Sequence, residues 1–340
     1  MRTARFFGTK KIHVIEQQIP PIGENDVLLK VHVCGICGGD ARQYLSMVQR
    51  GDVAPGHEIG AEVWQVGKVV KGLNKGDAVC VEPWVYCGEC DECLKGETNH
   101  CAKRKFMSAH LPGGISEYIA APAHVVYKMP ERTSYELCAL VEPLSVGVHT
   151  LRRCGLKPGE TVVVLGLGSI GLSTIAAARY LGAGKIIGSA KYPHQAAIAQ
   201  KLGVDVVVGT EENDVTDSVL SHTERGADIV VVGSMGVSIG LGVDILKNGG
   251  RMALLVEPQN IEPWDLGRAI GKEIVFFGCD AYAAMDGKRD YEISIEALLS
   301  GKVKLDAIIT HRFPLAQIKD AFEAATNRAE GAVKVLVNVT

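Results

Sequence analysis

The sequence has 340 residues, of which 47% are hydrophobic and 22% charged, with 39 glycines and a formal net charge of −3. At roughly 100–200 residues per domain this length indicates two domains, and the composition excludes a disordered, collagenous or coiled-coil chain. The small net charge gives no electrostatic drive toward nucleic acid or a membrane surface, so the predicted partner is a small molecule. No signal-peptide pattern is visible, which predicts a cytoplasmic protein whose ten cysteines are metal ligands or buried thiols.

Residues 1 to about 140 carry short β-branched runs separated by glycine and proline, which is typical of an irregular, β-rich domain. The strands predicted there are Val27–Val33, Glu62–Val66, Ala78–Val81 and Val125–Tyr127. From about residue 160 to 280 strands alternate with helices, which predicts a doubly wound parallel sheet of the α/β class. Its six predicted strands are Val162–Leu165, Lys185–Gly188, Asp205–Val208, Asp228–Val232, Met252–Val256 and Ile274–Phe277, with helices at Gly171–Leu181, His194–Leu202 and Ser238–Lys247.

The last part of the chain is too small to fold alone. It carries two amphipathic helices, Tyr291–Leu299 and Leu315–Ala325, and a closing strand, Val333–Val339. We therefore predict a first domain of residues 1–144 completed by residues 281–340, and a second domain of residues 145–280. Residues 161–178 are uncharged, but their glycine pattern indicates a buried strand, turn and helix rather than a membrane span.

A glycine-rich loop follows the strand Val162–Leu165 and opens a helix, which is the context that makes a G-x-G-x-x-G motif informative. The glycines permit a tight turn, a close approach of the backbone to a pyrophosphate and close helix–strand packing. The N-terminus of the helix favours the negative charge. The predicted dinucleotide-binding residues of this loop are Gly166, Gly168, Ser169, Ile170 and Gly171.

The end of the second strand predicts which dinucleotide binds. NAD sites usually place a carboxylate there for the ribose hydroxyls, but here the next carboxylate is Asp205, in the following strand. Ala190 would not repel a 2′-phosphate, Lys191 offers a cation and Ser189 a hydroxyl. These three residues predict a preference for NADP(H) over NAD(H).

Four cysteines with regular spacing form the most specific motif of the chain: Cys87, Cys90, Cys93 and Cys101. Four thiolates this close together suit a closed, tetrahedral structural zinc site. A bacterial iron–sulfur motif would place the fourth cysteine after three residues and follow it with proline, whereas here the gap is seven residues and Ala102 follows.

A second set of ligand types is dispersed along the chain, and it comprises Cys37, His57, Glu58 and Glu142. Thiolate, imidazole and carboxylate are the groups that a catalytic zinc takes while keeping one position exchangeable. Together with the glycine loop and the four-cysteine motif, these residues make the sequence resemble the zinc-dependent medium-chain alcohol dehydrogenases, within them the sorbitol or polyol dehydrogenase group. The segments that carry the resemblance are Gly35–Asp40, Gly56–Glu58, Cys87–Cys101, Glu142–Gly147 and Gly166–Gly171.

The resemblance covers essentially the whole chain and implies a GroES-like β-rich catalytic domain joined to a Rossmann domain. It further implies two zinc ions per chain, with Cys37, His57 and Glu58 at the catalytic zinc and Glu142 as a direct or water-mediated ligand. Asp40 would accept a hydrogen bond from His57 and fix its tautomer. The implied reaction is hydride transfer between a nicotinamide cofactor and a secondary alcohol of a polyol, sugar or cyclitol, in a homodimer or homotetramer.

Two residues depart from the family pattern. The family commonly has Ser or Thr two residues after the zinc cysteine and His three residues further on as a proton relay, whereas this chain has Gly39 and Arg42. Tyr44, Ser46, a substrate hydroxyl or a water held by Glu58 and Glu142 are alternative proton paths. Two other functions stay open. One is an NAD-dependent amino-alcohol dehydrogenase of the threonine type, and the other, which Gly39 and Arg42 support, is a nucleotide-binding zinc protein whose catalytic activity has decayed.

Overall fold

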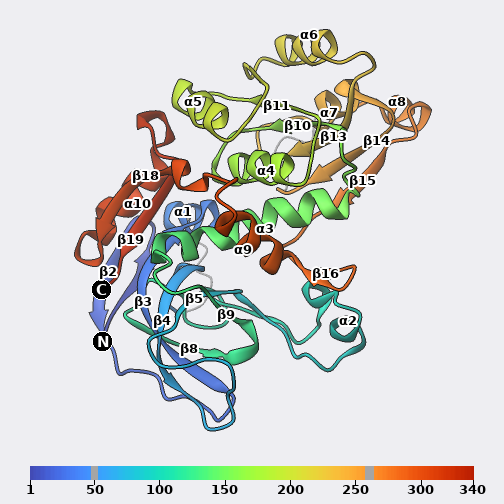
Figure 1. The fold of residues 1–340 in the computed structure, drawn as a ribbon. Coiled ribbons are helices and arrows are strands. Elements are labelled where there is room, and N and C mark those ends of the chain that lie inside the picture. The colour runs from blue at the N-terminus through green and yellow to red at the C-terminus, as the bar shows by residue number, and fades with distance from the viewer. Residues whose placement is uncertain (47–52, 257–263) are drawn as a thin grey trace. The chain divides into compact units, whose positions relative to one another are not determined.

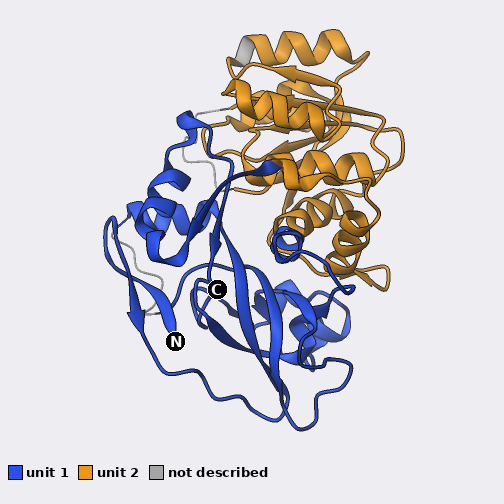
Figure 2. Ribbon diagram, turned by 60° about the vertical axis from the view of Figure 1, so that its left-hand side comes forward, with its two compact units in different colours: residues 1–142, 308–340 blue, residues 143–307 orange. Residues whose placement is uncertain are grey.

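The computed structural model describes residues 1–46, 53–256 and 264–340 (Figure 1). The chain divides into two compact units, which are coloured separately in Figure 2. Unit 1 consists of Met1–Glu142 and Ile308–Thr340, and unit 2 of Pro143–Ala307. Among the helices of the described segments, none combines the length and hydropathy that a membrane span requires.

Unit 1 is built on a seven-stranded sheet around the long strand β3 (Asp26–Ile36). This strand is rich in valine and leucine and almost wholly buried, as expected for a strand with neighbours on both edges. β4 pairs along one edge of β3, while β8 and β19 pair with successive halves of the other edge. The further strands of this sheet are β4 (Glu58–Val66), β5 (Ala78–Val81), β8 (Tyr118–Pro122), β9 (Val126–Lys128), β18 (Ile309–Pro314) and β19 (Lys334–Asn338).

Smaller elements surround this sheet. They are the hairpin β1 (Arg2–Gly8)–β2 (Lys11–Glu16), the ribbon β6 (Trp84–Val85)–β7 (Lys105–Phe106), and the helices α1 (Gly38–Leu45), α2 (Asp91–Leu94) and α10 (Ile318–Thr326). Short 3₁₀ turns lie at Thr98–His100, Ala123–Val125, Leu315–Gln317 and Arg328–Glu330. Helix α10 contacts α1, β2, β18 and β19, and its Phe322 ring lies 5.3 Å from the rings of both Phe6 and Tyr44. The C-terminal segment is therefore part of the core of unit 1 (Figure 1).

Unit 2 confirms the predicted doubly wound α/β fold. Six parallel strands form one sheet in the order β12-β11-β10-β13-β14-β15, so the strand order reverses at β10. The strands are β10 (Thr161–Leu165), β11 (Lys185–Ser189), β12 (Val206–Val208), β13 (Ala227–Val232), β14 (Leu246–Leu254) and β15 (Val275–Gly278). Its helices are α4 (Ser169–Tyr180), α5 (Pro193–Lys201), α6 (Glu212–His222), α7 (Ile239–Ile245), α8 (Leu266–Gly271) and α9 (Asp290–Leu299), and it also contains β16 (Ala284–Met285) and β17 (Lys288–Arg289). The 3₁₀ turn Leu305–Ile308 lies at its boundary with unit 1.

The predicted strands of unit 2 match the structure at their cores, and the ends of the three predicted helices differ from it by one or two residues. Helix α7 ends at Ile245 rather than Lys247, because Leu246 already pairs with Ala227 on β13. The pairing of β13 with β14 is then interrupted before it resumes at Arg251. Gly249, within the interruption, has a φ of +70°, a left-handed conformation that suits glycine and excludes a continuing helix.

Helix α3 (Tyr135–Arg153) is 19 residues long and was not predicted from the sequence. It contains Pro143, a residue that normally ends a helix because it lacks the N–H donor. The boundary between the two compact units falls at this proline. Glu142 therefore lies on a long helix, rather than on a loop between two domains.

The boundary after unit 2 lies at Ile308, whereas the sequence analysis assigned residues 281–307 to the first domain. Asp290, at the start of α9, explains why this segment is counted with unit 2. Its carboxylate lies 2.8 Å from Nδ1 of His149 and 2.5 Å from the guanidinium of Arg152, and both of these residues are on α3. Asp290 is fully buried, so this polar cluster fastens α9 to α3 within unit 2.

The crossing of α3 and α4 gives a test of the fold in unit 2. A Cβ on Gly147 would lie 2.9 Å from the Cα of Thr174, so Gly147→Ala forces two helix backbones apart. We expect the free energy of unfolding, measured by urea denaturation, to fall by about 1–3 kcal/mol. Gly271→Ala is the matched control, because its Cβ meets no atom within 4 Å. Equal stability of the two variants would contradict this packing.

Candidate functional site

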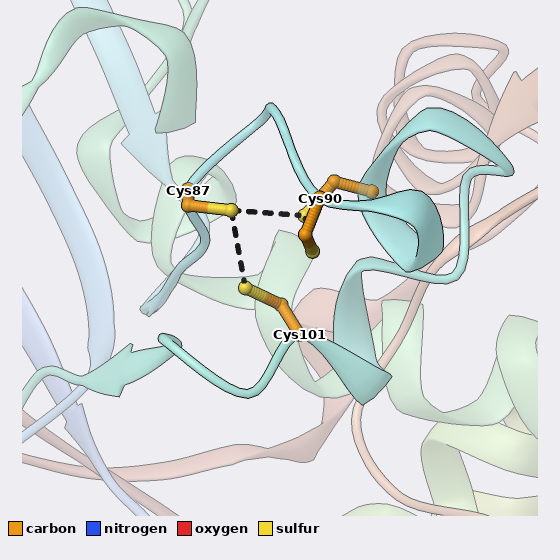
Figure 3. Close-up of side chains that lie close together, drawn as sticks. Cys87, Cys90 and Cys101 are labelled. Atoms are coloured by element: carbon orange, nitrogen blue, oxygen red, sulfur yellow. Dashed lines mark hydrogen bonds between the residues drawn. The ribbon is translucent and has the colours of Figure 1, made fainter.

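The four cysteines predicted as a structural zinc site converge in unit 1. All four sulfur atoms lie within 4.8 Å of one another. The sulfur atoms lie 3.5 Å apart in Cys90 and Cys93, 3.6 Å apart in Cys87 and Cys101, and 3.9 Å apart in Cys87 and Cys93. A tetrahedron with Zn–S bonds of ~2.3 Å requires sulfur separations of ~3.8 Å, so the thiols fit a zinc ion. Figure 3 shows three of the side chains pointing toward one another.

The polypeptide around these cysteines has little other structure to hold it. Between Cys90 and Cys101 it forms only the four-residue helix α2, in which no residue is buried, and one short 3₁₀ turn. Backbone amides of Glu89 and Cys90 hydrogen-bond to Cys87 and lower the pKa of its thiol to about 6. Burial and the neighbouring cysteines raise the pKa of Cys93 to about 12, so the preference for the thiolate, the form that binds metal, belongs to Cys87 and not to the whole cluster. The segment has few apolar contacts with which to stay folded without a metal ion.

A second cluster, Cys37, His57 and Glu58, brings its ligand atoms within 4.8 Å of one another. Cys37 is the residue between β3 and α1, where its thiol accepts a hydrogen bond from the backbone N–H of Gly39 at 3.4 Å. His57 and Glu58 lead into β4, and Glu58 pairs with Gly35 of β3. The pairing of β3 with β4 therefore places Cys37 next to His57 and Glu58, which follow it by 20 and 21 positions in the sequence.

The orientation of His57 differs from the contact that the resemblance implied. Its Nδ1 lies 3.3 Å from the hydroxyl of Ser108 but 3.7 Å from Oδ2 of Asp40, which is beyond hydrogen-bond distance. Asp40 instead accepts a hydrogen bond from the backbone N–H of Cys37 at 3.0 Å, which closes the first turn of α1. Ser108 therefore makes the contact with His57 that the resemblance assigned to Asp40, and nothing in its sequence surroundings indicated this.

The second cluster is strongly polar although it is buried. Burial disfavours a charged His57, but the nearby charges of Asp40 and Cys37 outweigh it and raise the pKa of His57 well above its ordinary value. Glu142, which is buried, also acts on His57 electrostatically, although it is not among the groups that meet within 4.8 Å. A divalent cation would balance this concentration of acidic groups.

Lys334 is a further residue of the second cluster that the sequence analysis did not find. It begins β19, is fully buried, and forms an ion pair with Glu58. Burial disfavours its ammonium form, yet the charges of Glu58, Cys37 and Glu142 raise the pKa of Lys334 above its ordinary value. Tyr44, considered above as a proton path, is fully buried and its ring packs against Phe6 and Phe322.

The glycine loop of unit 2 has the geometry of a dinucleotide cradle. Gly166 has a φ of +96°, and a Cβ on Gly171 would lie 2.1 Å from the carbonyl oxygen of Gly166, so neither position accepts a side chain without strain. A Cβ on Gly168 would meet nothing within 4 Å, which leaves room for a ligand at the N-terminus of α4. Within the described residues the Ser169 hydroxyl has no hydrogen-bond partner although it is buried, as expected of a group that serves a ligand.

The end of β11 places Ser189 and Lys191 differently. Ser189 is buried, and its hydroxyl accepts a hydrogen bond from the backbone N–H of Gly166 at 3.0 Å, which ties β11 to the loop. Lys191 is exposed, with its ammonium 5.7 Å from the ring centre of Tyr192. The carboxylate of Asp205 lies at the other end of β11, where it accepts hydrogen bonds from the backbone N–H of Ile186 and from the guanidinium of Arg179, each at 2.7 Å. It is therefore not placed as a ribose-binding carboxylate.

Comparisons with known proteins agree with the types of domain seen in unit 1 and in unit 2. Residues 23–131 match the family model of the alcohol dehydrogenase GroES-like domain, and residues 169–300 match that of the zinc-binding dehydrogenases. The sorbitol dehydrogenase of Bacillus subtilis (strain 168) is 32% identical over 347 residues, which covers 99% of this chain and 97% of the relative. The L-idonate 5-dehydrogenase of Vitis vinifera is 30% identical over 351 residues, which covers 99% of this chain and 94% of the relative.

A solved structure shows the same fold. A protein from Sinorhizobium meliloti 1021, described as a zinc-binding dehydrogenase and bound to NADP, superposes with a TM-score of 0.89 at 27% identity, covering 99% of this chain and 98% of that one. The two predicted domain types, the α/β fold class and the resemblance are confirmed by these matches. This chain belongs to the zinc-dependent medium-chain alcohol dehydrogenases, in their sorbitol or polyol dehydrogenase-like group.

Proposed function

We propose that the protein oxidises a secondary alcohol of a polyol, sugar or cyclitol, or reduces the matching ketone, with NADP(H) as the preferred cofactor and two zinc ions per chain. The observation that carries this is the convergence of Cys37, His57 and Glu58 in unit 1 of a chain whose unit 2 has an intact dinucleotide loop. The substrate class is supported by the similarity to the sorbitol and L-idonate dehydrogenases. Its cytoplasmic location and its assembly into a dimer or tetramer stay predictions from the sequence.

In this proposal each residue of the second cluster has a separate role. Cys37, His57 and Glu58 hold the catalytic zinc, with Glu142 as a direct or water-mediated ligand; a zinc ion there supplies Lewis acidity at the substrate oxygen. Ser108 orients His57, and Asp40 fixes Cys37 at the start of α1. Gly39 has no hydroxyl, so the proton of the alcohol does not leave through the side chain of residue 39.

In unit 2 the chain binds and orients the nicotinamide cofactor. The N–H groups at the start of α4 and the Ser169 hydroxyl would bind the pyrophosphate, and the glycines of the loop leave the space for it. Lys191 would pair with the 2′-phosphate of NADP, since the sequence Ser189–Lys191 at the end of β11 carries no carboxylate that would repel it. Ser189 would act through the loop, which it holds by the Gly166 N–H.

The metal content tests the function most directly. We expect two equivalents of zinc in the purified chain, one in Cys37→Ser and one in Cys90→Ser, measured by elemental analysis. Cys37→Ser should lose at least about 100-fold of the rate of cofactor reduction with a polyol panel, because a zinc ligand is gone. A single zinc in the unaltered chain, with no activity on any polyol, would instead support the decayed nucleotide-binding protein; oxidation of amino alcohols with NAD alone would support the threonine-type enzyme.

The contact between Ser108 and His57 predicts the effect of a substitution beside the cluster. Ser108→Ala removes the group that holds Nδ1, so zinc affinity at the second cluster should fall about 10-fold, measured by competition with a chelator. Ser116→Ala is the control, because that buried hydroxyl bonds to the carbonyl of Tyr118 instead. Unchanged affinity in Ser108→Ala would show that the ring is held by other contacts.

Titration with NADPH and NADH tests the cofactor preference without knowledge of the substrate. A charge-assisted contact is worth about 1.5–3 kcal/mol, so NADPH should bind roughly 10- to 100-fold more tightly. Lys191→Ala should remove most of this difference and leave the NADH dissociation constant unchanged. Lys201→Ala, at the far end of α5, should change neither constant. Tighter binding of NADH by the unaltered chain would overturn the preference.

A further inference from the structure

The ion pair between Lys334 and Glu58 is unusual in its burial and its symmetry. Both side chains are 1% exposed, and the ammonium lies 2.5 Å from one carboxylate oxygen and 2.6 Å from the other. The carbonyl oxygen of Ile36 lies at 3.5 Å from the same ammonium. Removing two charges from water is costly, and such pairs are often no more stable than apolar residues of the same size, so stability alone is a weak reason for this one.

Three adjacent strands build the contact. Gly35 of β3 pairs with Leu336 of β19 on one side and with Glu58 of β4 on the other. A Cβ on Gly35 would lie 1.9 Å from a carboxylate oxygen of Glu58 and 3.0 Å from its Cδ. The carboxylate thus occupies the space that any side chain at position 35 would fill, and it crosses β3 to reach the lysine on β19.

The same carboxylate belongs to the second cluster. An oxygen of Glu58 lies within 4.8 Å of the ligand atoms of Cys37 and His57, while both oxygens contact Lys334. A cation bound by Cys37 and His57 and the ammonium of Lys334 would therefore attract one carboxylate. Two positive charges near one another also repel, and at short range in a buried site this repulsion is large.

We propose that Lys334 is a positioning residue for the metal cluster. Its ammonium holds the Glu58 side chain across Gly35 and competes with the metal ion for the carboxylate of Glu58. This inference rests on the proposed function, because it requires a metal ion at Cys37 and His57. It assigns Glu58 a shared role: the carboxylate stays beside the metal without giving both oxygens to it. The cluster then binds metal less tightly than its ligands alone would allow, which leaves the ion a better Lewis acid toward substrate.

The direction in which metal affinity changes when Lys334 is replaced distinguishes a competing ammonium from a residue that only orients a ligand. Loss of a residue that only orients a ligand typically lowers metal affinity 10- to 100-fold. Loss of a competing ammonium raises it. For Lys334→Met, we expect zinc at the second cluster to bind at least about 10-fold more tightly. Lys334→Arg, which keeps the charge, should stay within about 3-fold of the unaltered chain.

The measurement is a zinc titration of the full chain against a competing chelator. Cys37→Ser provides the reference for the four-cysteine site, and its curve is subtracted from each variant. Lys128→Met is the matched control, because Lys128 also pairs with a carboxylate of unit 1, Asp77, at 2.7 Å, and neither residue belongs to the cluster. Cobalt in place of zinc supplies a second readout: the visible absorption of the second cluster should change in Lys334→Met and not in Lys128→Met.

A second comparison covers the case in which Lys334→Met does not fold because Glu58 is left buried without a partner. Glu58→Gln leaves the ammonium beside the metal, whereas the double variant with Lys334→Met removes both charges, a replacement that folds often tolerate. Zinc should bind the double variant at least about 10-fold more tightly than Glu58→Gln. Equal affinities, or weaker binding in Lys334→Met, would overturn the role of Lys334 while leaving the proposed function in place. No zinc at the second cluster of the unaltered chain would overturn both.

Discussion

The pairing of β3 with its neighbours is the constraint on which the second cluster depends. A strand of eleven residues, buried along most of its length, carries β4 on one edge and both β8 and β19 on the other. Because its carboxyl end runs directly into Cys37, the register of β3 against β4 decides where the thiol stands relative to His57 and Glu58. A shift of one residue in that register would turn each side chain to the opposite face of the sheet and separate the three groups.

At the loop after β10, the groups that would face a pyrophosphate are backbone N–H groups at the start of α4 rather than charged side chains. The loop after β10 is constrained at both ends, by the positive φ of Gly166 and by the close approach of Gly171 to the Gly166 carbonyl. Ser189 adds a hydrogen bond from the neighbouring strand, so the loop is held before any ligand binds. Preorganisation of this kind reduces the entropy lost on binding. It also explains why a short glycine motif is informative only between a strand and a helix.

The sequence predicted those parts of the site whose residues are close together or belong to a repeated pattern. The four cysteines, the glycine loop and the cores of the six parallel strands all follow from local spacing. Helix α3 was missed because Pro143 interrupts its pattern, and only contacts such as those of His149 and Arg152 with Asp290 show how it is held. Ser108 and Lys334 were missed because 51 and 276 positions separate them from their partners. No periodicity connects residues at such distances; the topology of the sheet does.

The order of segments along the chain gives this topology a consequence for folding. Unit 2 is inserted between Glu142 and Ile308, so the sheet of unit 1 lacks β18 and β19 until the last residues join it. Before that, one half of an edge of β3 is open and Glu58 has no lysine beside it. Contacts between residues so distant in sequence form late, and they slow the folding of a domain. The polar centre of the cluster is therefore completed by the end of the chain, and a sheet without that end would retain Cys37, His57 and Glu58 but not the charge that positions Glu58.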